Sequence, residues 1–248
     1  MVITIQARKG GQAKSTTAAA LAVASAEEGR RTLLIDLDGQ KGRAVGNAAM
    51  QLGVTASTPT FIDLFSGSEV TPVPAIKNLD MLPGGVPLVK LPQLFTEAVT
   101  TGKTLTPVTL VREAIKPLIT KYDVILIDCG PAPGLVNLSA LEAASVVICP
   151  LTPSAYAIPA LKELREEMSR LSGPKKLFIQ PVRTDSRTKM TRVIREEIGP
   201  ALASAMLPEV PVLARIEELP MEGKTILQDR PNSAPANAYR EAWKRIVA

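Results

Sequence analysis

Short apolar runs alternate with helical stretches along most of the chain. The runs, most of them bounded by Gly, Pro or Asp, cover residues 2–7, 31–38, 79–85, 123–130, 145–154, 176–182 and 210–216. Their apolar positions are nearly continuous rather than alternating, which is typical of strands that are buried on both faces. With helices between them, these strands predict an α/β fold: a doubly wound, mostly parallel sheet flanked by helices, with ligands at the carboxyl ends of the strands.

The sequence predicts a single domain. Its 248 residues, 46% hydrophobic and 21% charged, can bury a sizeable core. We find no internal repeat, low-complexity tract or interdomain linker, and interpret the Pro-containing stretch from Thr55 to Pro107 as loops and short helices of the same domain. Because the first strand begins at Met1 or Val2, we expect one domain over residues 1–248 and no N-terminal helix-turn-helix module.

Composition excludes several classes of enzyme. The chain has no histidine and two cysteines, which rules out a Ser-His-Asp or Cys-His catalytic pair and leaves little room for zinc sites. Cys129 and Cys149 lie in or beside apolar runs, so we expect buried small side chains. The formal charge of +5 suits an anionic partner. Without an apolar run of about 20 residues or a signal peptide, the expected location is cytoplasmic.

Residues 7–17, with the sequence ARKGGQAKSTT, have the features of a phosphate-binding loop. The segment follows a strand and opens an Ala-rich helix, so backbone N–H groups and the positive helix end point at one spot. Gly10 and Gly11 allow a close turn around an anion, Lys14 would neutralise phosphates, and Ser15 would offer its hydroxyl to Mg²⁺. However, Arg8 and Ala13 occupy both glycine positions of the usual G-x-x-x-x-G-K-[ST] pattern.

Three acidic residues end apolar strands. Asp36 and Asp38 follow the second run, and Asp128 ends the run that begins at Asp123. Any one of them would also suit a helix cap. Three carboxylates at the carboxyl ends of strands are costly to bury without a cation, so together they favour a phosphate-bound Mg²⁺.

Lys9 to Ser15 resembles the deviant Walker A motif, K-G-G-x-x-K-[ST], of the ParA/MinD family of P-loop ATPases. The family includes plasmid and chromosome partition proteins, and small ParA-type plasmid partition proteins are the most similar in size. Further similar segments are residues 31–44, residues 122–161 with the Walker B strand and the helix after it, and residues 184–188 and 214–223.

The resemblance implies an ATP-dependent homodimer in which two chains enclose two ATP molecules with Mg²⁺. Lys9, the signature lysine, would reach the partner's nucleotide, Asp38 would position the attacking water, and Asp36 would support the loop. The implied catalytic residues are Lys9, Lys14 and Asp38. The implied nucleotide-binding residues are Lys9, Gly10, Gly11, Gln12, Ala13, Lys14, Ser15, Thr16 and Asp128. The implied Mg²⁺ ligands are Ser15, Asp36 and Asp128.

Two positions depart from the family pattern. Ala13 replaces a glycine where permissive backbone angles are often needed, which predicts strain of roughly 1 kcal/mol and reduced nucleotide affinity. Gly39 replaces a proline, which predicts a more flexible loop after Asp38. The adenine contacts stay open, with Gln180 and Arg183 as candidates.

Family members of the partition type bind DNA without sequence preference as ATP dimers, and a ParB-like, centromere-binding adaptor stimulates hydrolysis. The basic residues that fit this role are Arg187, Lys189, Arg192 and Arg215, with Arg195 and Lys224 nearby in the sequence. They would contact phosphates and carry no sequence information. The alternative is an ordinary solvated helix face. If they bind DNA, the protein is nucleoid-associated.

Two other functions are considered. A MinD-like or organelle-positioning ATPase could use the amphipathic segment 236–248, in which Tyr239, Trp243 and Ile246 recur at helical spacing. The segment resembles the family's last helix, whose apolar face packs on the core, so membrane binding is not expected. An ATP-dependent ligase or iron–sulfur reductase is disfavoured, because no further substrate pocket is evident and the contexts of Cys129 and Cys149 do not match. The cargo, whether plasmid, chromosome or protein organelle, stays open.

Overall fold

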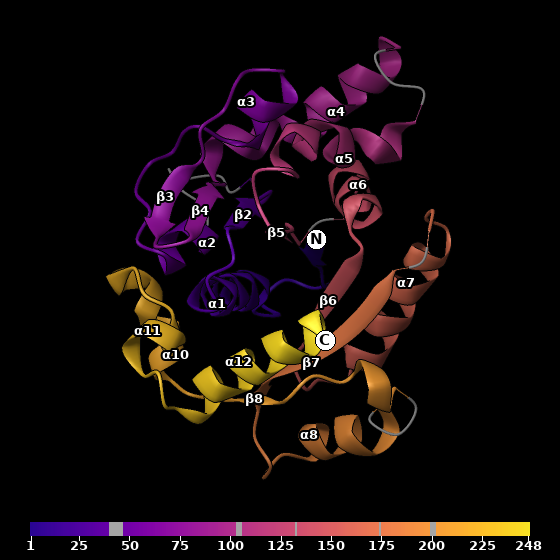
Figure 1. Ribbon diagram of the computed structural model, residues 1–248. Helices are drawn as coiled ribbons and strands as arrows, with labels where there is room; N and C mark the ends of the chain where they lie inside the picture. The colour runs from indigo at the N-terminus through magenta and orange to yellow at the C-terminus, as the bar shows by residue number, and fades with distance from the viewer. Residues whose placement is uncertain (40–46, 103–105, 132, 174, 199–201) are drawn as a thin grey trace.

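An eight-stranded sheet runs through the centre of the molecule, with helices on both of its faces (Figure 1). The computed structural model describes residues 1–39, 47–102, 106–131, 133–173, 175–198 and 202–248. The strands, in spatial order, are β3 (Val73–Ile76), β4 (Leu79–Leu82), β2 (Thr32–Asp36), β5 (Val124–Asp128), β1 (Val2–Ile5), β6 (Val146–Leu151), β7 (Lys176–Thr184) and β8 (Val210–Pro211). All neighbouring strands are parallel except β3 and β4. The predicted doubly wound, mostly parallel sheet is therefore confirmed.

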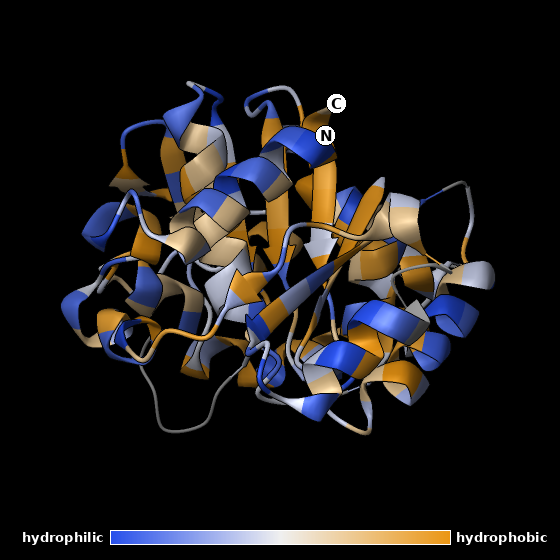
Figure 2. Cartoon of the chain, turned by 90° about the horizontal axis from the view of Figure 1, so that it is seen from below, coloured by the Kyte–Doolittle hydropathy of each residue, from blue (hydrophilic) through white to orange (hydrophobic). Residues whose placement is uncertain are grey.

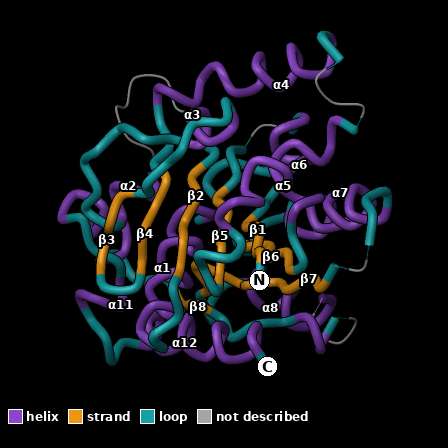
Figure 3. Tube along the Cα trace, turned by 45° about the horizontal axis from the view of Figure 1, so that its top comes forward, coloured by secondary structure: helices purple, strands orange, loops and turns teal. Residues whose placement is uncertain are grey.

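Helices connect the strands and cover the sheet, as the trace in Figure 3 makes clear. The longer helices are α1 (Lys14–Glu27), α4 (Leu91–Thr100), α6 (Leu135–Ala143), α7 (Ala157–Ser169) and α12 (Ala234–Val247). The shorter ones are α2 (Asn47–Gln51), α3 (Phe61–Phe65), α5 (Leu110–Ile115), α8 (Lys189–Val193), α10 (Arg215–Glu218) and α11 (Ile226–Asp229).

Successive residues of a strand face opposite layers of the core. Leu34 of β2 packs in the layer that contains α1 and α12, whereas Leu33 packs in the layer that contains α3 to α6. Val147 of β6 packs in a third cluster with α7. The central strands are accordingly apolar, and the hydrophilic positions concentrate on the surrounding helices and loops (Figure 2). Burial on both faces explains why the strands were visible as continuous apolar runs.

Each of the seven predicted runs contains a strand, with two differences from expectation. The run 210–216 forms strand only at Val210 and Pro211, because the chain then turns into α10. The edge strand β3 was missed: it pairs antiparallel with β4, is only four residues long and contains Pro74, which lacks a backbone N–H and therefore weakens the strand pattern. Part of the family-like segment 31–44, residues 40–44, lies outside the described residues.

The amphipathic C-terminal helix packs on the core as predicted. Tyr239 and Trp243 of α12 are buried in the cluster that contains α1. The Trp243 indole N–H donates to Glu28 at 3.0 Å, and the Tyr239 hydroxyl lies 3.4 Å from the hydroxyl of Thr17. The apolar face of α12 is therefore covered by protein. Within the described part of the chain, none of the helices is sufficiently long and apolar to cross a membrane.

Cys129 and Cys149 are both buried free thiols, as expected. Burial raises the pKa of both thiols, that of Cys129 well above its usual value and that of Cys149 to about 12. Neither side chain is therefore a reactive thiolate at neutral pH.

Candidate functional site

The loop between β1 and α1 turns through two left-handed residues. Gly11 has φ 74°, and Ala13, the residue before the helix, has φ 54° and ψ 32°. The Ala13 carbonyl accepts the Thr17 N–H at 2.9 Å, so this unusual backbone directly starts α1. The expectation that Ala13 occupies a position better suited to glycine is confirmed, because a Cβ is disfavoured in this region.

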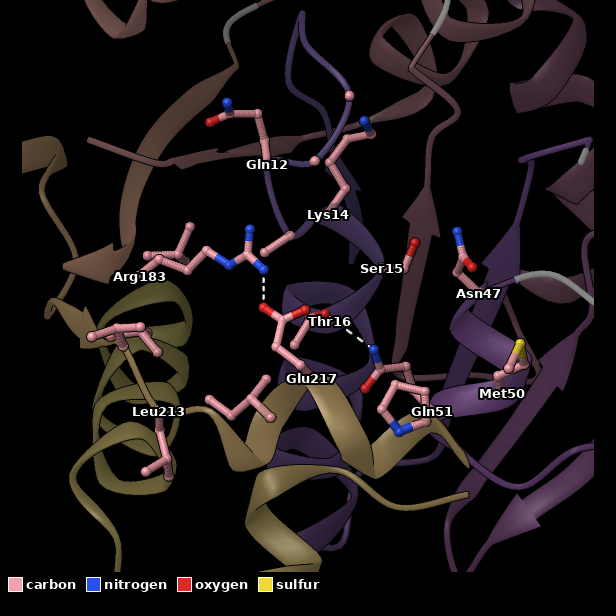
Figure 4. A pocket seen from close by; sticks show the side chains of 18 of the residues that line it. Gln12, Lys14, Ser15, Thr16, Asn47, Met50, Gln51, Arg183, Leu213 and Glu217 are labelled. Carbon is pink, nitrogen blue, oxygen red and sulfur yellow. Dashed lines mark hydrogen bonds and ion pairs between the residues drawn. The ribbon is translucent and has the colours of Figure 1, made fainter. Parts of the chain in front are cut away.

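Side chains tie the loop and the start of α1 to two neighbouring elements. The Gln12 side-chain oxygen accepts the Thr152 N–H at 2.8 Å, just beyond β6. The Gln51 amide of α2 donates to the Thr16 hydroxyl at 3.1 Å. Lys14 is buried in the first turn of α1, beside Ser15 and Thr16 at one end of a cavity (Figure 4). The loop is thus held in a turn whose backbone N–H groups and helix start are of the kind that binds anions.

Lys9 behaves differently from Lys14. Its side chain is exposed, its ammonium lies 4.7 Å from the centre of the Tyr156 ring, and it is not among the residues that line the cavity. The preceding Arg8 forms an ion pair with Glu167 of α7 at 2.5 Å. The first part of the loop is therefore attached to the segment around α7, outside the cavity.

Asp36 and Asp128 end adjacent strands in register, at the carboxyl edge of the sheet. Asp36 is fully buried and accepts the N–H groups of Asp38 at 2.9 Å and Ala48 at 3.3 Å. A Cβ on Gly84 would lie 2.5 Å from the Asp36 carboxyl carbon, so that approach requires glycine. Burial, with a contribution from Asp128, raises the Asp36 pKa well above its usual range. Its contacts are those of a residue that shapes the loop.

Asp128 has a different environment. It is fully buried, and among the described residues neither of its carboxylate oxygens has a hydrogen-bond partner of standard geometry. Burial raises the pKa of Asp128 to about 7; Ser15 and Lys14 act against this shift, and Asp38 adds to it. A buried carboxylate with unbonded oxygens is costly unless a cation or its water shell satisfies it.

These residues fit a Mg²⁺ ion that is shared with phosphates. The described side chains contain no group of three His, Cys, Asp or Glu residues that could hold a metal by themselves. Mg²⁺ in nucleotide sites typically takes one or two protein oxygens and completes its shell with phosphate and water. Ser15 and the orphaned Asp128 supply that kind of partial shell.

Asp38 lines the cavity, and close backbone packing surrounds it. A Cβ on Gly130 would lie 3.0 Å from the Asp38 carboxylate. A Cβ on Gly39 would lie 2.7 Å from the backbone of Leu88. A side chain at position 39 would therefore not fit without displacing the Leu88 backbone, which is a packing reason for glycine here. The greater flexibility of this loop stays a prediction.

The cavity has a volume of about 520 Å³, within the range of small-molecule sites. The P-loop residues 10–16 form one end. The other walls come from α2, β7, residues 210–214, α10, the turn after it and Tyr239. Of the two base-contact candidates, Arg183 lines the cavity, whereas Gln180 is buried with its amide donating to the Pro208 carbonyl.

Sequence reasoning missed several lining residues: Asn47, Met50, Gln51, Glu217 and Tyr239. Glu217 lies in the family-like segment 214–223, which gave it no role, and the other four come from short or distant elements and match no motif. Tyr239 was noted, but only as part of an apolar helix face.

The four predicted DNA-contact residues are not equivalent. Arg187 is 86% exposed and forms a two-pronged ion pair with Asp185. Lys189 and Arg192 of α8 are exposed, and no described residue forms an ion pair with them. The neighbouring Arg195 pairs with Glu209.

Arg215 of α10 is held by three carboxylates. Its guanidinium contacts Asp229 at 2.8 Å, Glu222 at 2.6 Å and Glu218 at 3.2 Å, and its side chain is only 22% exposed. The charge of Arg215 is therefore compensated within the chain, which the sequence did not predict.

Comparisons with known proteins agree with this geometry. A family model described as an AAA domain matches residues 1–179. The chromosome partitioning protein ParA of Myxococcus xanthus is 31% identical over 98% of this chain and 88% of that protein. The chromosome-partitioning ATPase Soj of Thermus thermophilus is 30% identical over 99% of this chain and 95% of that protein.

Solved structures share the fold. Apo McdA from Cyanothece superposes with a TM-score of 0.81 at 19% identity, covering 99% of this chain and 98% of that one. MinD from Pyrococcus horikoshii, complexed with Mg-ADP, superposes with a TM-score of 0.78 at 24% identity, covering 99% and 95%.

Proposed function

Because this chain belongs to the ParA/MinD family of P-loop ATPases, we propose that it is a partition-type ATPase whose ATP-bound homodimer binds DNA without sequence preference. A ParB-like, centromere-binding adaptor stimulates hydrolysis and so releases the DNA. We take residues 1–248 as one ATPase domain, because strands from both halves of the chain join one sheet. The protein is cytoplasmic and associates with the nucleoid.

The observation that carries the proposal is the preformed loop with an orphaned carboxylate beneath it. The N–H groups of residues 10–15 and the buried Lys14 bind the phosphates of ATP, and Thr16 lines the same end of the cavity. Ser15 and Asp128 hold Mg²⁺, which when bound neutralises phosphate charge. The two carboxylate oxygens of Asp36 already accept hydrogen bonds from the backbone N–H groups of Asp38 and Ala48. Asp36 therefore supports the loop rather than ligating the metal directly.

Asp38 is the residue that orients the attacking water. It lines the cavity at the carboxyl edge of the sheet, and its backbone N–H is held by Asp36. Lys9 acts on the nucleotide of the partner chain. Its exposure and its position outside the cavity of its own chain support that role.

Lys189 and Arg192 provide the main contacts to DNA phosphates, and Arg187 adds a weaker one because Asp185 already binds it. Arg215 contributes less than the sequence suggested, because three carboxylates compensate its charge. Dimerisation doubles the phosphate contacts, so ATP acts as a switch for DNA affinity.

The test measures binding of unrelated DNA duplexes over a salt series with Mg-ATP, Mg-ADP or no nucleotide. Affinity should rise sharply with ATP only. Lys189→Ala should lower the slope of log K against log salt by about 0.9 per lost contact, hence about 1.8 per dimer, at unchanged ATP affinity. Lys121→Ala, an exposed lysine before β5, is the control and should leave the slope unchanged.

Equal DNA affinity in all three nucleotide states would refute the proposal. Binding of liposomes in place of DNA would instead favour a MinD-like role. We expect no liposome binding, because Tyr239 and Trp243 are buried against α1 and the apolar face of α12 is therefore already covered by protein.

A further inference from the structure

Arg183 and Glu217 form an ion pair inside the cavity, and none of the catalytic roles above uses this pair. The sequence offered Arg183 as a candidate base contact but gave no chemistry for the contact and no partner for its guanidinium. Arg183 belongs to β7 and Glu217 to α10, and both line the cavity. Figure 4 shows their side chains pointing toward each other in the region between the P-loop and Leu213. The side chains are 42% and 60% exposed, so the pair contributes little to fold stability.

A β-bulge aims Arg183 into the cavity. Val182 pairs with Val210 and Thr184 with Pro211, which leaves Arg183 as an extra residue on β7. Arg183 has φ 56°, a left-handed conformation that is uncommon and costly for a residue with a long side chain. The flanking Val182 and Thr184 are buried, and Arg183 is exposed. Bulges commonly redirect a side chain in this way next to ligand sites.

The residues that line the cavity are polar at the P-loop end and mostly apolar farther from it. The loop end, with Lys14 and backbone N–H groups, suits phosphates. Around Arg183 the lining is mostly apolar: Val182, Val210, Leu213, Ile216 and Met221. A nucleobase has flat apolar faces, so this end suits a base, and the guanidinium is the planar cation present there.

We propose that Arg183 is the base-contact residue of the site: its guanidinium, fixed in orientation by Glu217, stacks on the purine ring of the bound nucleotide. The inference rests on the proposed function, since it assumes a nucleotide on the P-loop. Stacking by a planar cation requires the plane as well as the charge, so lysine cannot replace arginine here.

The experiment titrates Mg-ATP and magnesium tripolyphosphate, which lacks a base, into the wild type and variants by calorimetry. Arg183→Ala should weaken ATP binding about tenfold, the size of one stacking contact, and change tripolyphosphate binding less than about twofold. Arg183→Lys should weaken ATP binding as much as Arg183→Ala. Lys14→Ala should weaken the binding of both ligands.

Two further variants exclude indirect effects. Arg183→Gly relieves the left-handed strain, so it should unfold at a higher temperature than Arg183→Ala while binding ATP as weakly. Arg183→Ala leaves the Glu217 carboxylate without its cation, and this charge could repel the nucleotide. The double variant Arg183→Ala, Glu217→Gln removes that charge as well. ATP binding should stay weak in this double variant. Recovery of ATP affinity would mean that repulsion by Glu217, and not lost stacking, caused the effect, and would overturn the inference.

The results also separate this inference from the proposed function. If Arg183→Ala weakens ATP and tripolyphosphate binding equally, Arg183 contacts phosphate and the stacking assignment is wrong. If it weakens neither while Lys14→Ala weakens both, the nucleotide site stands and only the role of Arg183 fails. If the wild type binds neither ligand, the proposed function fails together with the inference.

Discussion

Replacing Ala13 with glycine should stabilise the protein, although alanine-to-glycine changes in the interior of a helix destabilise. Ala13 adopts φ 54° and ψ 32°, and its carbonyl accepts the first N–H bond of α1 from Thr17. Glycine can hold this backbone without the clash that a Cβ causes. The Thr17 hydrogen bond involves only backbone atoms, so the substitution leaves it in place.

The expected gain is the small difference of three terms. Relief of the left-handed conformation stabilises by roughly 1.5 kcal/mol, more than the roughly 1 kcal/mol expected from the sequence, because the backbone angles of Ala13 lie fully in the left-handed region. The greater freedom of glycine in the unfolded chain costs about 0.7 kcal/mol. Ala13 is half-buried at the edge of the core, so the loss of its methyl costs about 0.4 kcal/mol. The net gain is about 0.4 kcal/mol, which corresponds to a Tm increase of about 1 °C.

Thermal and urea unfolding of the wild type and three variants test whether Ala13→Gly stabilises the protein. Ala22→Gly, in the interior of the same helix, should cost about 1 kcal/mol or more, because glycine is a poor helix former. Ala13→Val should destabilise, since a β-branched side chain is strongly disfavoured at positive φ. The predicted order of stability is Ala13→Gly, wild type, Ala22→Gly, with Ala13→Val below the wild type.

A loss of stability in Ala13→Gly as large as that in Ala22→Gly would refute the strain argument. In that case Ala13 would be fitted to its loop, and its methyl would matter more than its backbone angles. The same variant should bind ATP at least as tightly as the wild type, because the loop needs no strained residue to bind phosphate.

Three further substitutions test other parts of the account. Asp128→Asn should raise the Tm measured without nucleotide, because it removes a buried charge that has no hydrogen-bond partner among the described residues, and should abolish ATP hydrolysis; a lower Tm would contradict this. Trp243→Ala should cost about 3–5 kcal/mol in urea unfolding, and a loss below about 1 kcal/mol would show that α12 is only loosely packed. Arg215→Ala should lower the Tm, because three carboxylates lose their partner, whereas a pure DNA-contact residue would leave the Tm unchanged.

The parts of the fold that sequence patterns predicted are those determined locally. A strand, a glycine-containing turn and an Ala-rich helix follow one another within residues 2–27, so the phosphate loop was recognisable without any long-range contact. Asp36 and Asp128 were recognisable for the same reason, since each ends an apolar run. The sequence did not show that the two carboxylates have different environments, because these environments depend on Gly84 and on backbone N–H groups from distant segments.

Long-range pairings account for what the sequence did not reveal. Glu217 meets Arg183 across 34 positions, and Gln51 meets Thr16 across 35, with no motif to link them. The compensation of Arg215 depends on Asp229, which only the fold of α10 and α11 brings close. A cationic residue can therefore resemble a family's DNA contact in sequence and still be paired within its own chain.

The central claim is that residues 9–16 form a nucleotide site, and the most direct test is calorimetric titration of Mg-ATP into the wild type and Lys14→Ala. We expect one bound ATP per wild-type chain and no detectable binding to Lys14→Ala, because no other buried lysine lines the described cavity. Circular dichroism of both proteins checks that the variant folds. A wild type that binds no ATP, or a folded Lys14→Ala that binds ATP as tightly as the wild type, would contradict the account.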